Sequence, residues 1–143
     1  MAAQRVDPYK NYNFLVEIDS LTVAGFAECT GLESEVSVIE YREGGDTIVR
    51  KLPSMRKYGN ITLKSGVTSS SELQDWHQNI LNGVPDRRNG VVKLLDDERN
   101  EVVRWVFFNA FPRKWEGPRL SGSGNEVAIE TLELSCERLE RAS

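Results

Sequence analysis

The feature that most constrains the fold is the spacing of apolar residues, which recur with a period of two in short segments separated by turn residues. In the first such segment, residues 10–19, Phe14, Val16 and Ile18 alternate with polar residues. This alternation is typical of a half-buried β-strand. Further strands are predicted at residues 21–29, 34–41 and 60–64. The turn-type pair Asp19-Ser20 predicts that the first two strands form an opening hairpin.

The second half of the chain holds one clear hairpin and one ambiguous segment. Residues 90–96 and 101–111 flank a polar turn, and the second of them is apolar on both parities, as in a central strand. We expect that strand to leave the sheet at Phe111-Pro112. The last segment, NEVAIETLELSCERLE, fits a strand with a bulge near Glu130-Thr131 and fits a helix equally well.

Residues 69–83 carry the only clear helical pattern. Ser69 and Glu72 have the spacing of a capping box, Gly83 is suited to a left-handed C-terminal position, and Pro85 follows. One apolar stripe is formed at helical spacing by Leu73, Trp76, Ile80 and Leu81. The stripe predicts that one face of the helix packs on the sheet and buries Trp76.

About seven or eight strands with one helix predict a mainly β fold, either a β-barrel or two packed antiparallel sheets with one α-helix packed against them. The length of 143 residues fits a single domain, 1–143, with one hydrophobic core.

Composition removes several classes of function. The chain has 18 Lys and Arg against 22 Asp and Glu, a formal charge of -4, so the whole-chain balance gives no footprint for binding nucleic acid. No apolar run is long enough to span a membrane and no signal peptide is visible, so we expect synthesis in the cytoplasm and no membrane insertion by this chain. Cys29 and Cys136 lack a C-x-x-C spacing and are expected to be reduced and buried.

The sequence offers little for chemistry. Its single histidine, His77, lies beside the helical stripe and is expected to be a partly buried structural residue. The glycines match no phosphate-binding pattern, and Asp96-Asp97-Glu98 is typical of a solvated turn. No nucleophile, base and orienting group stand at a recognisable spacing. We therefore expect no catalytic residues, no cofactor and no metal site.

A long segment between the strands at 34–41 and 60–64 is unusual. It begins with the turn signal Glu43-Gly44-Gly45-Asp46, has no acidic residue from 47 to 64, and contains Pro53, which excludes a regular central strand. Connections longer than about 12 residues are usually functional or disordered. The segment is basic and also apolar, with Ile48, Val49, Leu52 and Met55. A mobile surface loop and a contact with another copy of the chain both fit these residues; the second would build rings or filaments.

The sequence also resembles a known family along nearly its whole length. DPYKNYNFLVEID, AGFAECTGLESEVSVIEYREGG, KYGNITLKSGVT followed by the helix with Trp76, RWVFFNAFPRKWEGPRL and NEVAIETLELSCE occur in the order found in the tail tube proteins of contractile phages and phage-like injection systems. The resemblance implies a structural subunit of the inner tube, in which six copies form a ring and rings stack into a hollow conduit for DNA or effector proteins. It also implies that the last segment is a strand and that strands from each copy line the channel.

The resemblance assigns the long segment, about 42–58, to the extended loop that contacts neighbouring subunits. The residues expected to carry that contact are Arg42, Glu43, Arg50, Lys51, Leu52, Met55, Arg56, Lys57 and Tyr58. The implied partners are other copies of the chain, the contractile sheath, baseplate and tail-terminator proteins, and DNA or protein cargo. If much of the negative charge faces the channel, an acidic wall would repel DNA and favour its passage. The alternative is a monomeric β-barrel that binds a small ligand.

Overall fold

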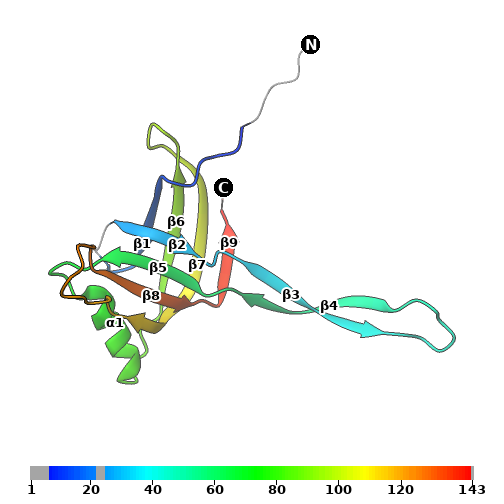
Figure 1. Cartoon of the computed structure of the whole chain (residues 1–143). Helices are drawn as coiled ribbons and strands as arrows, with labels where there is room; N and C mark the ends of the chain where they lie inside the picture. The colour runs from blue at the N-terminus through cyan, green and yellow to red at the C-terminus, as the bar shows by residue number, and fades with distance from the viewer. Residues whose placement is uncertain (1–6, 22–24, 143) are drawn as a thin grey trace, which may run out of the picture.

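The computed structural model describes residues 7–21 and 25–142, which form two crossing antiparallel sheets with one helix beside them (Figure 1). The β6 sheet contains β1 (Phe14–Ile18), β6 (Arg88–Leu95), the first part of β7 (Glu101–Glu116) and β9 (Arg138–Arg141). The β5 sheet contains β2 (Phe26–Thr30), β5 (Ile61–Gly66), β8 (Ile129–Ser135) and the second part of β7. The prediction of two packed sheets with one helix is confirmed.

Strand β7 belongs to both sheets. It pairs with β6 and β9 up to Ala110 and with β8 from Phe111 onward. The prediction that the chain leaves the sheet at Pro112 is therefore wrong. Pro112 is fully buried, and the pairing with β8 shifts register just after it. A proline is tolerated there because the hydrogen-bonded ladder is already interrupted.

Two further sequence predictions concern strand partners. The prediction that the first two strands form a hairpin is wrong, because β1 pairs with β6 and β2 pairs with β5. Alternation specifies which side chains face the core but not which strand lies alongside. The strand assignment of the last segment is confirmed as β8 and β9, whereas the bulge near Glu130-Thr131 is absent from its regular pairing with β5. The strand is interrupted instead at residues 136–137, which separate β8 from β9.

The core lies between the two sheets and under the helix. Strands β1, β2, β5, β6, β7 and β8 contribute to it, and on β1, β5 and β8 the buried residues alternate as the period of two requires. Its buried side chains are Val16, Ile18, Phe26, Ile61, Leu63, Leu73, Trp76, Val92, Phe107, Ala110, Leu132 and Leu134.

Helix α1 (Glu72–Leu81) packs against β7. The predicted capping box is wrong, because the N-cap residue is Ser71, whose hydroxyl bonds the Asp75 carboxylate at 2.8 Å rather than a backbone N–H. The predicted end is confirmed: Gly83 has φ of +79°, and its N–H donates to the Ile80 carbonyl at 3.1 Å. The next N–H, that of Val84, reaches back to the helix as well, which completes a Schellman motif.

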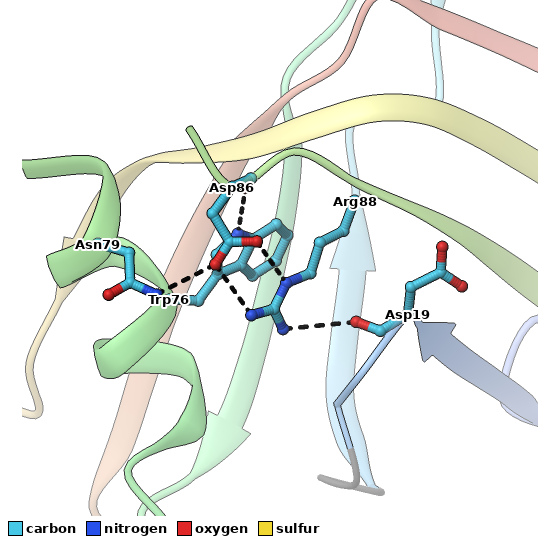
Figure 2. A network of polar contacts seen from close by, with 5 residues as sticks. All are labelled: Asp19, Trp76, Asn79, Asp86 and Arg88. Carbon is cyan, nitrogen blue, oxygen red and sulfur yellow. Dashed lines mark hydrogen bonds and ion pairs between the residues drawn. The ribbon is translucent and has the colours of Figure 1, made fainter. Parts of the chain in front are cut away.

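A polar network fixes the helix to the start of β6 (Figure 2). The indole N–H of Trp76 donates to the backbone carbonyl of Asp86 at 2.8 Å. The carboxylate of Asp86 accepts two hydrogen bonds from Arg88, each 3.0 Å, and one from Asn79 at 3.1 Å. The guanidinium of Arg88 lies 4.9 Å from the centre of the Trp76 ring. These bonds from Arg88 hold the pKa of Asp86 below its ordinary value.

In the described ranges, no helix is long and apolar enough to cross a membrane, and no three His, Cys, Asp or Glu side chains are grouped to hold a metal ion.

Candidate assembly interface

Strands β3 (Ser34–Tyr41) and β4 (Arg50–Tyr58) form a two-stranded ribbon that projects away from the two sheets (Figure 1). We call residues 34–58 the arm and the rest of the described chain the body. The interpretation of residues 42–58 as a loop is wrong, because nine of these residues form β4, which pairs with β3 alone and is therefore not a central strand. Pro53 is accommodated opposite Val38, next to a register shift in a ribbon that pairs on one side only.

Two glycines shape the root of the arm, where β2 leads into β3 and β4 leads into β5. Gly31 has φ of +89°, and a Cβ there would lie 1.9 Å from the Asn60 carbonyl oxygen. A Cβ on Gly59 would lie 2.2 Å from the Glu33 side chain. Gly31 needs glycine because its φ is positive and the atoms that a Cβ would meet are backbone, whereas at Gly59 the flexible Glu33 side chain would have to move.

The arm exposes apolar side chains on both of its faces. The register places Val36 and Val38 on one face, and Ile39, Tyr41 and Leu52 on the other. Of the large hydrophobic residues exposed in the part of the chain that the structure describes, eight lie on the arm: Val36, Val38, Ile39, Tyr41, Ile48, Val49, Leu52 and Met55. Met55 is the most exposed of them at 69%. An apolar surface of this extent marks an interaction site.

The structure brings the nine predicted contact residues together on the arm. Arg42 and Glu43 lie in the turn between the strands, and the other seven, Arg50, Lys51, Leu52, Met55, Arg56, Lys57 and Tyr58, lie on β4. All are exposed except Tyr58, which is half-buried at the root.

Charge on the arm is partly paired. Lys51 lies opposite Glu40, and Lys57 lies opposite Glu35. Arg50 forms an exposed ion pair with Asp46 at 3.4 Å, whereas Arg56 lies opposite the apolar Val36.

Sequence reasoning missed the half of this surface that β3 contributes. Val36, Val38, Ile39 and Tyr41 belong to a segment that was expected to be an ordinary strand of the body. The sequence did hold a signal, because these apolar residues occupy both faces of β3. Such a strand is either buried on both faces in the fold or covered by another copy on assembly.

A cavity of about 410 Å³ opens between the sheets of the body. Phe14, Leu32, Val92 and Trp105 line it together with Cys29. Burial raises the pKa of the Cys29 thiol to about 11. Cys29 and Cys136 are free thiols, each half-buried rather than fully enclosed. A small-ligand-binding barrel would use this cavity, whose lining also includes the exposed Glu28, which pairs with Lys64 at 3.3 Å.

Comparison with known proteins identifies the class of subunit. No protein of curated function matched the sequence. A chain of the PVC extracellular contractile injection system, solved as the sheath-tube complex in its extended state, is 26% identical and superposes with a TM-score of 0.83 over 95% of this chain and 92% of that one. A chain of the anti-feeding prophage baseplate is 25% identical, with a TM-score of 0.85 over 97% and 98% of the two chains.

A more distant structure shares the fold alone. Hcp1 from Flavobacterium johnsoniae is 15% identical, with a TM-score of 0.57 over 90% of this chain and 94% of that one.

The family model of the T4-like virus tail tube protein gp19 matches residues 10–140, almost the whole sequence. The chain belongs to the T4-like virus tail tube protein gp19 family and is a structural tube subunit of a contractile injection system or phage tail.

Proposed function

We propose that copies of this chain form six-membered rings that stack into the inner tube, and that the arm carries the contact with neighbouring copies. The observation that carries this proposal is an arm that projects from the body with exposed apolar side chains on both faces. A two-stranded ribbon without a covered face is at best marginally stable in water. The arm therefore gains its stability when another copy covers it.

The free energy available from this contact is large. Fully burying one aliphatic side chain contributes about 1.5 to 3 kcal/mol, and the eight arm residues are each between 38% and 69% exposed. Covering their exposed parts contributes on the order of 10 kcal/mol per arm before the loss of conformational and translational freedom is subtracted. That is enough to drive assembly of a small subunit.

The sheets also support closure through repeated copies. β1, β2 and β9 each pair with a single neighbouring strand within the described chain, as do β3 and β4 in the arm. Unpaired strand edges promote uncontrolled aggregation unless they are covered. A ring of identical copies covers them with one repeated interface.

The partners proposed for this chain follow from its relatives. One relative was solved in a sheath-tube complex, others in a baseplate, a tube-terminating cap and a sheath and tube terminator. We accordingly assign this chain a place inside a contractile sheath, between a baseplate and a terminator, as part of a phage tail or phage-like particle. Its role is structural, with no enzymatic activity.

The test removes apolar side chains from the arm without changing its charge. The triple variant Ile39→Ser, Leu52→Ser and Met55→Ser should abolish rings and tubes in electron micrographs and leave a monomer in light scattering. The body should keep its melting temperature within a few degrees, because the arm contributes none of the buried core residues.

The matched control replaces equally exposed apolar residues of the body, Val67, Leu120 and Val127, with serine. This control should assemble normally. Normal tubes from the arm variant would place the contact elsewhere, and loss of tubes from the control alone would place it around residues 117–128.

A further inference from the structure

We propose that the outer face of the β5 sheet, the face turned away from the core, is the wall of the channel, and that its charge balance suits the passage of protein cargo. This inference rests on the proposed tube. The wall face is formed by alternate residues of four neighbouring strands: Glu28, Thr30, Thr62, Lys64, Lys114, Glu116, Thr131 and Glu133.

The composition of this face is the first argument. Every one of these residues is polar, and three are threonines, whereas the residues between them on β5 and β8 are buried. Ile129, which continues the row on β8 opposite Gly66, is half-buried at the end of the face. Phe111 lies at the corner of the sheet, opposite Ser135, and the Arg87 guanidinium covers its ring at 4.9 Å. The wall face is therefore suited to permanent contact with water.

The outer face of the β6 sheet is different. Leu15, Val91, Val106 and Phe108 lie on it and are half-buried, in register with charged residues such as Lys93. A face with an apolar row gains free energy when protein covers it, and a purely polar face does not. Of the two sheets, the β5 sheet is the one whose outer face needs no partner.

Continuity with the arm is the second argument. β3 follows β2 after three residues, and β4 leads into β5 after two, so the arm prolongs the β5 sheet beyond the body (Figure 1). If arms join neighbouring copies, the sheet that continues from copy to copy is the β5 sheet. The core and the β6 sheet then lie on one side of that continuous sheet, which leaves the wall face toward the channel.

Charge identifies the cargo. Three carboxylates on this face, those of Glu28, Glu116 and Glu133, are matched by the cations of Lys64, Arg113 and Lys114. Lys64 pairs with Glu28 at 3.3 Å, and Arg113 pairs with Glu133. Five side chains of the wall face surround a shallow hollow of about 150 Å³: Thr62, Lys114, Glu116, Thr131 and Glu133.

The excess negative charge of the chain therefore lies away from this face, and the expectation of an acidic wall does not apply to it. A protein cargo presents charges of both signs and apolar patches. A wall whose charges are paired, and whose apolar side chains are confined to Ile129 at the start of β8 and Val127 just before it, binds neither strongly. DNA would instead call for a uniformly acidic wall that keeps phosphates away from lysine and arginine.

The first experiment locates the face. Thr62→Cys and, separately, Thr131→Cys tubes are labelled with maleimide-gold, and end-on views are recorded by electron microscopy. Gold should lie on the channel side of the ring, and Glu17→Cys, on the outer face of the β6 sheet, should place gold elsewhere. Wild-type tubes control for labelling of the half-buried native thiols. Gold from both threonine positions on the outer rim would overturn the assignment, while failure of the wild-type protein to form rings would instead overturn the proposed tube.

The second experiment tests the charge balance. Wild-type tubes should retain neither a fluorescent single-stranded oligonucleotide nor a fluorescent acidic protein. Changing Glu28, Glu116 and Glu133 to Gln leaves the cations unpaired, so these tubes should retain the oligonucleotide at low salt. That retention should fall by roughly 300-fold or more between 50 and 200 mM salt, as for six or more phosphate contacts to a single strand.

The matched control changes Glu17, Glu101 and Glu140 to Gln, which alters the net charge equally away from the wall face. It frees the cations of Lys93, Arg104 and Arg138 instead, so any oligonucleotide that it binds should lie outside the channel and be digested by nuclease, whereas oligonucleotide retained at the wall face should be protected. Retention by wild-type tubes, or equal nuclease-protected retention by both triple variants, would overturn the charge-balanced wall.

Discussion

Replacing Trp76 with alanine is the sharpest test of how the helix is attached to the sheets. Trp76 is 1% exposed and is the largest fully buried side chain of the described structure. Its indole also donates to the Asp86 carbonyl at 2.8 Å, and Arg88 lies 4.9 Å from the ring centre (Figure 2). The substitution therefore removes core volume, one hydrogen bond and a cation–π contact together.

The expected magnitude follows from the burial. Large-to-small substitution of a buried tryptophan lowers the free energy of unfolding by about 3 to 5 kcal/mol. With an unfolding entropy of about 2.1 cal/mol/K per residue, a chain of 143 residues loses roughly 3 °C of melting temperature per kcal/mol. The melting temperature should fall by roughly 10 to 17 °C. Trp76→Phe keeps most of the ring and loses the hydrogen bond, so it should cost about 1 to 2 kcal/mol.

The assay is thermal unfolding followed by circular dichroism under dilute conditions in which sedimentation shows a monomer, because assembly would itself raise the melting temperature. Gln74→Ala, an exposed position on the same helix, is the control and should change the melting temperature by no more than about 2 °C. A fall of less than about 5 °C for Trp76→Ala would refute the reasoning, since it would mean that the helix is not held by its buried ring.

Three further predictions concern the arm and the network around Asp86. Reversing Arg50, Lys51, Arg56 and Lys57 to glutamate should prevent tube formation while circular dichroism shows a folded body; tubes in normal number would show that these cations meet no acidic partner. Gly31→Ala should also impair assembly, because a Cβ would lie 1.9 Å from the Asn60 carbonyl and displace the root of the arm, and unchanged tube counts would contradict that geometry. The pKa of Asp86 is lowered in the fold, so its carboxylate stabilises the protein at neutral pH and that contribution is lost as pH falls below about 4. Asp86→Asn should therefore lower the melting temperature most at neutral pH, and a difference from wild type that persists undiminished at about pH 3 would show that the carboxylate charge is not the cause.

Sequence reasoning succeeded where the local residue pattern determines the structure. It failed where contacts with distant strands or with other copies of the chain determine it. The period of two located most strands but not β4, and Gly83 marked the helix end, because both signals depend on side-chain direction and backbone conformation. The pairing of β1 with β6 depends instead on contacts between residues about 75 positions apart, which alternation does not encode. Only the basic half of the arm was anticipated from the sequence. The apolar half on β3 looked like a core strand, because residues that become buried on assembly carry the same pattern as residues buried on folding.

The passage of β7 through both sheets has a mechanical consequence. Its sixteen residues represent about 50 Å of extended chain without an intervening loop. A pull on one end is resisted by hydrogen bonds to β6 and β9 along the first part and to β8 along the second. Tension is thus carried from one sheet to the other along covalent backbone rather than across packed side chains. When a sheath shortens and drives its tube forward, β7 transmits the load through each subunit. Pulling β7 out of the sheets requires many backbone hydrogen bonds to break at once.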